Sequence, residues 1–107
     1  LGVRPTKDSE GVLQDTHWSS GLFGYFPTYT LGNLISAIID SKMRKDMESY
    51  NEDIMKGNLN PIREWLRLKI HQYGSAYAPK VLLDKSLNEG YNPDYFLTYL
   101  ENKYLGI

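Results

Sequence analysis

The stretch LGNLISAIIDSKMRKDMESYNEDI, from Leu31 to Ile54, decides the fold class of this chain. Its apolar residues recur at spacings of three and four, which places them on one face of an α-helix. They are Leu31, Leu34, Ile35, Ile38, Ile39, Met43, Met47, Tyr50 and Ile54. The pattern predicts a long amphipathic helix that begins between Thr28 and Leu31, breaks near Asp46, and ends before Gly57.

Further helices are predicted downstream, each with a proline near its start. In NPIREWL, Asn60 is the predicted cap, and Pro61 suits the first helical position because its missing N–H would be unbonded there anyway. This helix is predicted to end at Gly74. In APKVLLDKSLNEG the next helix starts near Pro79 and is predicted to end at Gly90.

The last helix is predicted within NPDYFLTYLENKYLGI, with Asn92 as the cap and Pro93 as the first helical residue. Its buried face is predicted to consist of Tyr95, Phe96, Tyr99, Leu100 and Tyr104. No run alternates as a strand does. The chain is therefore predicted to be all-α, with an irregular aromatic N-terminal arm over residues 1–27 and four or five helices over residues 28–107.

Length and charge restrict the class of protein. A chain of 107 residues is the size of one small domain. Twelve basic and thirteen acidic residues leave a formal charge of −1, which weighs against nucleic acid or a membrane surface as partner. There is also no basic recognition helix, so a DNA-binding domain is disfavoured.

The cysteine count and the N-terminus bear on location. The chain has no cysteine, which excludes disulfides and thiolate ligands and fits a reducing compartment. No apolar run approaches the ~20 residues that span a bilayer, and no signal-peptide pattern is present. We expect a cytoplasmic protein. Because the chain begins at Leu1 rather than at methionine, we also expect it to be a piece of something longer.

The arm contains the stretch GVLQDTHWSSGLFGYFPTY at residues 11–29, where special residues concentrate. His17 follows Gln14 and Asp15, and either of these could determine which ring nitrogen carries the proton. Tyrosines downstream could place phenolic hydroxyls near the imidazole. The candidate site residues are Gln14, Asp15, His17, Tyr25 and Tyr29.

A structural interpretation competes with the functional one. The aromatic residues could form a small core that joins the arm to the first helix, with His17 satisfying a buried carbonyl; composition alone favours this. His71 is expected at a helix end, with no ligand role. Two histidines without a His-Glu-x-x-His pair cannot build a zinc site, so we expect no metal site in this chain.

A family resemblance favours the functional interpretation of the arm over the structural one. GVLQDTHW at residues 11–18 resembles the Gly-x-x-Gln-Asp-x-His-Trp signature of the thermostable zinc carboxypeptidases, the carboxypeptidase Taq family. FGYFPTYTLGN at residues 23–33 resembles the segment that follows it, and the likeness extends over essentially the whole chain. The fixed positions are all present, as Gly11, Gln14, Asp15, His17 and Trp18.

Members of that family are several times longer and largely helical, and their His-Glu-x-x-His zinc site and arginine-containing substrate motif lie upstream of the signature. The resemblance implies that residues 1–107 are a C-terminal segment of a larger helical zinc peptidase, with residues 1–27 as an active-site arm and 28–107 as a helical array. The zinc would be bound outside this chain. The implied partners are a peptide substrate and the remaining N-terminal part of the enzyme.

The resemblance also implies roles for the candidate residues. In a peptidase that removes single residues from peptide C-termini, negative charge grows on the carbonyl oxygen in the transition state. His17 and Tyr25 would donate hydrogen bonds to it, with Tyr29 a second candidate, while Gln14 and Asp15 would orient His17 or contact substrate. The segment alone would be inactive, and its exposed arm could produce a homodimer. The alternative is a non-catalytic helical interaction module that grips a partner with its aromatic arm.

Overall fold

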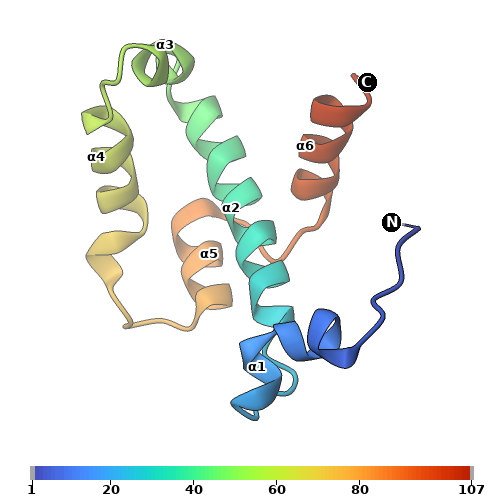
Figure 1. Ribbon diagram of the computed structural model, residues 1–107. Helices are drawn as coiled ribbons and strands as arrows, with labels where there is room; N and C mark the ends of the chain where they lie inside the picture. The colour runs from blue at the N-terminus through green and yellow to red at the C-terminus, as the bar shows by residue number, and fades with distance from the viewer. Residues whose placement is uncertain (1, 107) are drawn as a thin grey trace. The chain divides into compact units, whose positions relative to one another are not determined.

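The computed structural model describes residues 2–106, and all of its regular elements are helical (Figure 1). The α-helices are α1 Thr16–Ser19, α2 Pro27–Asp46, α3 Tyr50–Met55, α4 Asn60–Lys69, α5 Pro79–Leu87 and α6 Asp94–Tyr104. Short 3-10 helices cover Asp8–Glu10, Val12–Gln14 and His71–Tyr73. The predicted all-α class is confirmed. No helix in the described part of the chain is both long and apolar enough to cross a membrane.

The described chain forms two compact units, one up to Leu31 and one from Gly32 onward. The arm was predicted to end at residue 27, and the N-terminal unit extends beyond it because Tyr29, in the first turn of α2, packs against the rings of His17 and Phe26. Within this unit the arm is also less irregular than predicted, because it contains α1 and two 3-10 turns.

The core of the C-terminal unit is centred on α2 and α5. Ile38 of α2 is completely buried and lies with Leu83 and Leu87 of α5. Partly buried residues pack around these three, namely Ile35, Ile39, Trp65, Ile70 and Tyr95. The apolar stripe that predicted α2 therefore supplies the centre of this core, and α4 and α6 add to it from other sides (Figure 1).

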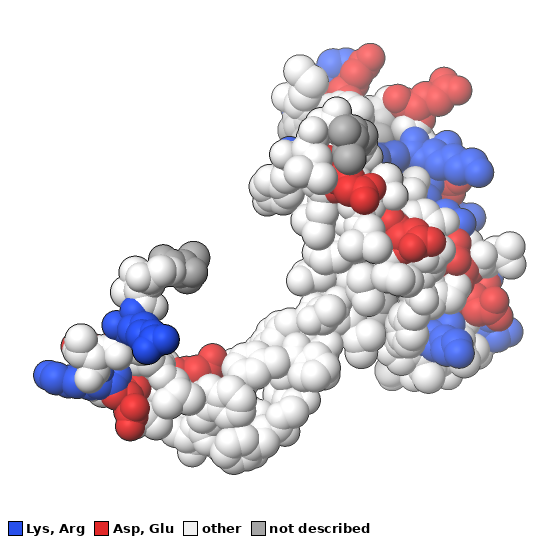
Figure 2. Space-filling model, turned by 90° about the vertical axis from the view of Figure 1, so that its right-hand side faces the viewer, with Lys and Arg blue, Asp and Glu red and all other residues white. Residues whose placement is uncertain are grey.

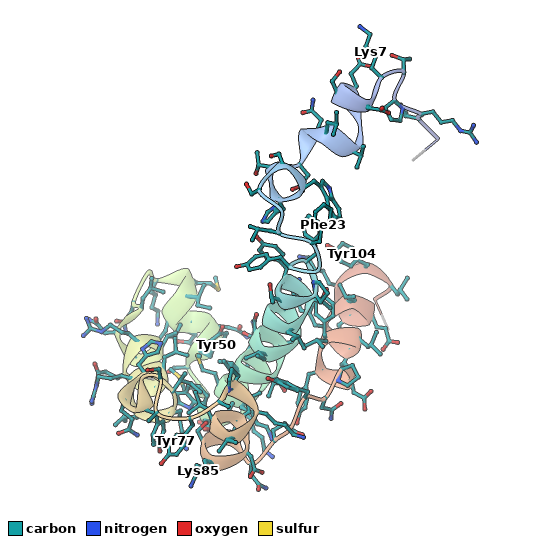
Figure 3. The ribbon with its side chains drawn as sticks, turned by 90° about the horizontal axis from the view of Figure 1, so that it is seen from below. Lys7, Phe23, Tyr50, Tyr77, Lys85 and Tyr104 are labelled. Atoms are coloured by element: carbon teal, nitrogen blue, oxygen red, sulfur yellow. The ribbon has the colours of Figure 1, made fainter. Side chains whose placement is uncertain are left out.

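The predicted break at Asp46 is confirmed, since α2 ends there and α3 begins at Tyr50. Tyr50, labelled in Figure 3, donates a hydrogen bond from its hydroxyl to Asp40 Oδ1 at 2.7 Å. Arg44 lies over the Tyr50 ring at 4.5 Å and donates from Nε to Asp40 Oδ2 at 2.7 Å. Burial and the hydrogen bond to Asp40 raise the pKa of Tyr50. These contacts hold α3 against the end of α2.

The start of α6 is tied to the other helices by a polar cluster. The hydroxyl of Tyr95 donates to Glu89 Oε2 at 2.7 Å, and Lys42 Nζ of α2 lies 3.4 Å from the same oxygen. The hydrogen bond from Tyr95, together with Lys42, holds the pKa of Glu89 below its usual range. This cluster borders the apolar core, because Tyr95 also packs on it.

Several helix ends differ from the predictions. The helix α4 ends at Lys69 rather than at Gly74, and the separate 3-10 turn His71–Tyr73 lies between the two. Asn60 is the first residue of α4 rather than its cap, and Leu59 precedes it without a side-chain capping bond.

The helix α5 ends at Leu87, before the predicted end at Gly90, because the next residue, Asn88, adopts the left-handed conformation with φ of +50°. Asparagine tolerates this conformation better than most residues. The hydrogen bond expected of Asn92 is present, since Asn92 Oδ1 accepts the backbone N–H of Asp94 at 3.0 Å, but α6 begins at Asp94, and Pro93 is its N-cap rather than its first residue.

The predicted buried face of α6 is only partly correct. Tyr95 reaches the core, but Tyr99 is 45% and Tyr104 is 69% exposed. One cation lies near both rings instead, because Lys103 Nζ is 5.2 Å from the Tyr99 ring centroid and 5.3 Å from the Tyr104 ring centroid. Of the predicted face, Tyr95, Phe96 and Leu100 are therefore partly buried, whereas Tyr99 and Tyr104 are exposed.

Removing the centre of this core gives a direct test of the packing. Ile38→Ala is expected to lower the free energy of unfolding by about 2–5 kcal/mol, because it deletes buried groups and leaves a cavity. Leu97 of α6 is the control, since it is 52% exposed and Leu97→Ala should change stability by less than about 0.5 kcal/mol. Urea unfolding followed by far-UV circular dichroism measures both. Equal losses would contradict the assigned core.

Candidate functional site

Asp15 holds His17 through both its backbone and its ring. Asp15 is the N-cap of α1, and its Oδ1 accepts the backbone N–H of His17 at 2.8 Å. The same oxygen lies 2.8 Å from Nδ1 of the His17 ring. Aspartate suits the cap position because its short side chain reaches an N–H that has no partner within the helix. The start of α1 thus determines how the imidazole is oriented.

These contacts also determine the charge of Asp15. The backbone N–H of His17, and then its ring, hold the pKa of Asp15 below its ordinary value. At neutral pH the carboxylate is therefore ionised and can only accept hydrogen bonds. The pairing to Nδ1 places the proton-bearing edge of the imidazole toward Asp15.

The other ring nitrogen of His17 is bonded to Tyr29. The distance from Nε2 to the Tyr29 hydroxyl is 3.0 Å, and the two rings are nearly perpendicular, with an interplanar angle of 89°. Tyr29 lies in the first turn of α2, 12 residues further along the chain. Asp15, His17 and Tyr29 therefore form a continuous hydrogen-bonded chain.

Turns at two glycines bring Asp15, His17 and Tyr29 together. After α1 the backbone reverses in a Schellman motif, in which Leu22 N–H donates to the carbonyl of His17 at 2.9 Å and Gly21 has φ of +71°. Gly24, with φ of +80°, then permits the turn that is closed by Tyr25 N–H on the carbonyl of Leu22. A side chain at either glycine would be strained there. The aromatic segment consequently returns to the imidazole.

Aromatic rings surround His17. Tyr25 stacks on the imidazole with ring centroids 5.6 Å apart, and Phe26 lies at 5.0 Å. Trp18 contacts Phe26 and Phe23, each at 5.4 Å. The small aromatic core expected from the structural interpretation is therefore present, and it encloses the hydrogen-bonded chain rather than replacing it. His17 itself is bonded to a carboxylate and a phenol, not to a carbonyl.

One side of this cluster is open. Phe23 is 72%, Tyr25 is 45% and Tyr29 is 52% exposed, and Figure 3 shows Phe23 among the side chains of this segment. From Thr16 to Leu31 the chain has no Lys, Arg, Asp or Glu, and this part appears as white surface in Figure 2. A ligand covering this side would meet aromatic surface with a few polar groups, as is typical of binding sites.

Gln14, the remaining predicted site residue, lies apart from the imidazole of His17. The side-chain amide of Gln14 donates to the carbonyl of Ser9, so of the two predicted orienting residues it is Asp15 that holds His17. Sequence reasoning placed Tyr25 ahead of Tyr29 and assigned Phe26 no contact with His17, although Phe26 packs on it. The helix α2 begins at Pro27, before the predicted start between Thr28 and Leu31. Proline is common at the first helical position, so Pro27 was the sequence signal that could have placed Tyr29 in the first turn.

The site does not fit a metal. Within residues 2–106, no group of three or more His, Cys, Asp or Glu side chains is placed to hold an ion. Both ring nitrogens of His17 already have protein partners. The described residues can instead donate and accept hydrogen bonds and hold a proton on His17.

Comparisons with known proteins agree with the sequence motif. A profile described as carboxypeptidase Taq (M32) metallopeptidase matches residues 1–104. The chain is 49% identical over 98% of its length to thermostable carboxypeptidase 1 of Pyrococcus furiosus and 42% identical over its whole length to thermostable carboxypeptidase 1 of Thermus thermophilus. Carboxypeptidase 1 of Bacillus subtilis is 39% identical over 97% of the chain.

A solved structure has the same fold. The structure titled Pyrococcus furiosus carboxypeptidase Apo-Mg matches 97% of this chain with a TM-score of 0.89 at 48% identity. In each of these comparisons the chain spans only 21% of the relative's length. The profile match covers the arm, its hydrogen-bonded residues and nearly all of the helices, so the chain belongs to the carboxypeptidase Taq (M32) metallopeptidase family.

Proposed function

We propose that this chain is the C-terminal part of a zinc-dependent carboxypeptidase, to which it contributes hydrogen-bond donors and one wall of the substrate cleft. The observation that carries this proposal is the chain of hydrogen bonds through Asp15, His17 and Tyr29, which lies within the matched residues. The relatives named above are themselves named as carboxypeptidases. The substrate would be a peptide with a free C-terminus, and the rest of the enzyme would be the chain's partner.

The donors match what hydrolysis of a peptide bond requires. As the carbonyl carbon becomes tetrahedral, negative charge develops on its oxygen, and preorganised donors aimed at that oxygen stabilise the transition state. Tyr25 and Tyr29 are about half exposed, the ring of Tyr25 stacks on His17, and the hydroxyl of Tyr29 is bonded to it, which makes all three residues candidates for this role. Gln14 would contact the substrate, and Asp15 would hold the imidazole.

The aromatic residues have a second use in this proposal. Trp18, Phe23 and Phe26 present apolar surface beside the donors. With substrate in place this surface would exclude water, and hydrogen bonds to a developing charge are stronger in the low dielectric that results. The bound metal would activate the attacking water and polarise the carbonyl, and the described residues contain no group of three or more ligating side chains placed to hold it.

Substitutions in the full-length enzyme test the assigned donors. His17→Ala and Tyr25→Phe are each expected to lower kcat by ~10²–10³, with a smaller effect on KM, because they remove hydrogen bonds that strengthen in the transition state. Zinc content and far-UV circular dichroism should be unchanged. His71→Ala is the control, because His71 is exposed and lies outside the cluster. Near-normal turnover in both variants would favour the small aromatic core as the only role of the arm.

The chain on its own provides a second test. Because its described residues offer no metal site, we expect the purified 107-residue chain to bind no zinc at micromolar concentration and to cleave no peptide. Competition with a coloured chelator measures the first, and release of C-terminal amino acids from a peptide measures the second. Stoichiometric zinc binding or turnover by this chain would contradict the proposal that the metal is bound by the rest of the enzyme.

The open aromatic side leads to an expectation about assembly. Leu22, Phe23, Tyr25 and Tyr29 are all at least 45% exposed, and contiguous apolar patches of this kind are rarely left uncovered. In the isolated chain we expect either self-association through these residues or weak hydrogen-exchange protection of residues 13–29. Sedimentation at several concentrations, beside hydrogen exchange, measures both.

A substitution identifies the surface involved. Phe23→Ser should weaken self-association, whereas Met55→Ser, at an 87% exposed position of α3, should leave it unchanged. A strict monomer with strongly protected amides in residues 13–29 would mean that the arm completes its own core. That result would favour the alternative function, an interaction module that needs no catalytic partner.

A further inference from the structure

Phe23 is the most exposed aromatic residue of the N-terminal unit. It is 72% exposed, whereas Tyr25 is 45% and Tyr29 is 52% exposed. Phe23 lies in the turn between Gly21 and Gly24, whose φ angles are +71° and +80° (Figure 3). A Cβ at either glycine would meet no atom beyond the adjacent residues within 4 Å, so it is the path of the backbone that requires glycine there. The turn thus presents the ring of Phe23 to its surroundings.

Contacts between aromatic rings connect Phe23 to the imidazole of His17. The ring centroid of Phe26 lies 5.0 Å from that of His17, and the centroid of Trp18 lies 5.4 Å from that of Phe26. The centroid of Phe23 lies 5.4 Å from that of Trp18. Trp18 and Phe26 are partly buried, so this row of rings begins at the proposed donors and ends at an exposed ring. The apolar surface at Phe23 is therefore continuous with the proposed site.

The length of this row limits which part of a peptide can reach Phe23. In the proposed reaction the carbonyl to be cleaved lies at the donors, and a single residue lies on its C-terminal side. An extended peptide advances about 3.3 Å per residue, so three ring contacts of 5.0–5.4 Å span at most about five residues of substrate. Because two rings separate Phe23 from the imidazole, the substrate residue that it faces lies on the N-terminal side of the cleaved bond.

The surface around Phe23 suits an apolar side chain. Covering an exposed ring with an apolar group removes apolar area from water, and a second aromatic ring adds the preference for offset or edge-to-face pairs. The neighbouring Leu22, which is 45% exposed, enlarges this apolar surface. From Thr16 to Leu31 the chain has no Lys, Arg, Asp or Glu. A charged substrate side chain would therefore lose water there and gain no ion pair from this segment.

We propose that Phe23 is a specificity-determining residue, which contacts a peptide side chain within about five residues on the N-terminal side of the cleaved bond and favours an aromatic or aliphatic group there. This inference rests on the proposed function and names the class of substrate side chain that the cleft wall recognises. Phe23 takes no part in bond cleavage, since its side chain has no group that donates or accepts a proton.

Hydrolysis of a peptide series by the full-length enzyme tests this assignment. The series consists of acetylated alanine hexapeptides in which one residue before the cleaved bond is Phe or Asp, with acetyl-Ala-Ala as the short reference. Release of the first C-terminal residue is measured. At one of these positions, wild-type kcat/KM should be about tenfold higher with Phe than with Asp. Phe23→Ser should abolish this preference, Phe23→Leu should retain part of it, and the loss for acetyl-Ala-Ala should be smaller than for the Phe hexapeptide.

A control variant and a stability measurement separate substrate recognition from a structural role. Met55→Ser, at an exposed position of α3, should keep the wild-type preference, and urea unfolding should show no greater loss of stability in Phe23→Ser than in Met55→Ser. If Phe23→Ser destabilises the enzyme and lowers kcat/KM equally for every peptide, another part of the enzyme covers the ring and the inference is wrong. An unchanged preference in Phe23→Ser also overturns it. Both results leave the proposed function standing, because that function fails on near-normal turnover of His17→Ala and Tyr25→Phe.

Discussion

The C-terminal unit depends on the burial of one apolar stripe of α2. Ile38 has no exposed surface, and the residues that cover it come from α5, with Trp65 of α4 and Tyr95 of α6 beside them. None of these shorter helices would be stable alone in water, since isolated helices of this length are marginal. Their common contact with α2 is what makes them one unit.

The N-terminal unit depends on a different interaction, the two hydrogen bonds that Asp15 Oδ1 accepts from the backbone N–H and the ring Nδ1 of His17. It begins α1 and orients the imidazole in one step. The glycine turns that follow then place Tyr29 on the opposite edge of the ring. A residue that caps a helix is thereby also part of the site, so helix capping and site geometry cannot be varied independently at this position.

The chain buries little of its large apolar surface. The buried apolar residues among those described are Ile38, Met43, Leu83 and Leu87, whereas Phe23 is 72% and Met55 87% exposed. The relatives that match this chain are about five times as long, since it spans 21% of each. Cover by other parts of such an enzyme and by its substrate, as the proposed function requires, would account for these exposed residues.

Sequence alone determined the helical class, the break at Asp46, the hydrogen bond of Asn92 at the start of α6 and the family, because periodicity, capping bonds and an eight-residue motif are local properties. It did not determine which apolar residues are covered. Tyr99 and Tyr104 have the helical spacing of a buried face and are nonetheless exposed, since spacing cannot show whether a neighbour is present.

The tertiary structure also decided the chemistry of the site. That Asp15 rather than Gln14 orients His17, and that Tyr29 bonds Nε2 while Tyr25 stacks, depends on the left-handed turns at Gly21 and Gly24. Residues 12 positions apart meet only if the intervening backbone reverses in one particular way. A motif specifies which groups are available, and the path of the chain decides which atoms they touch.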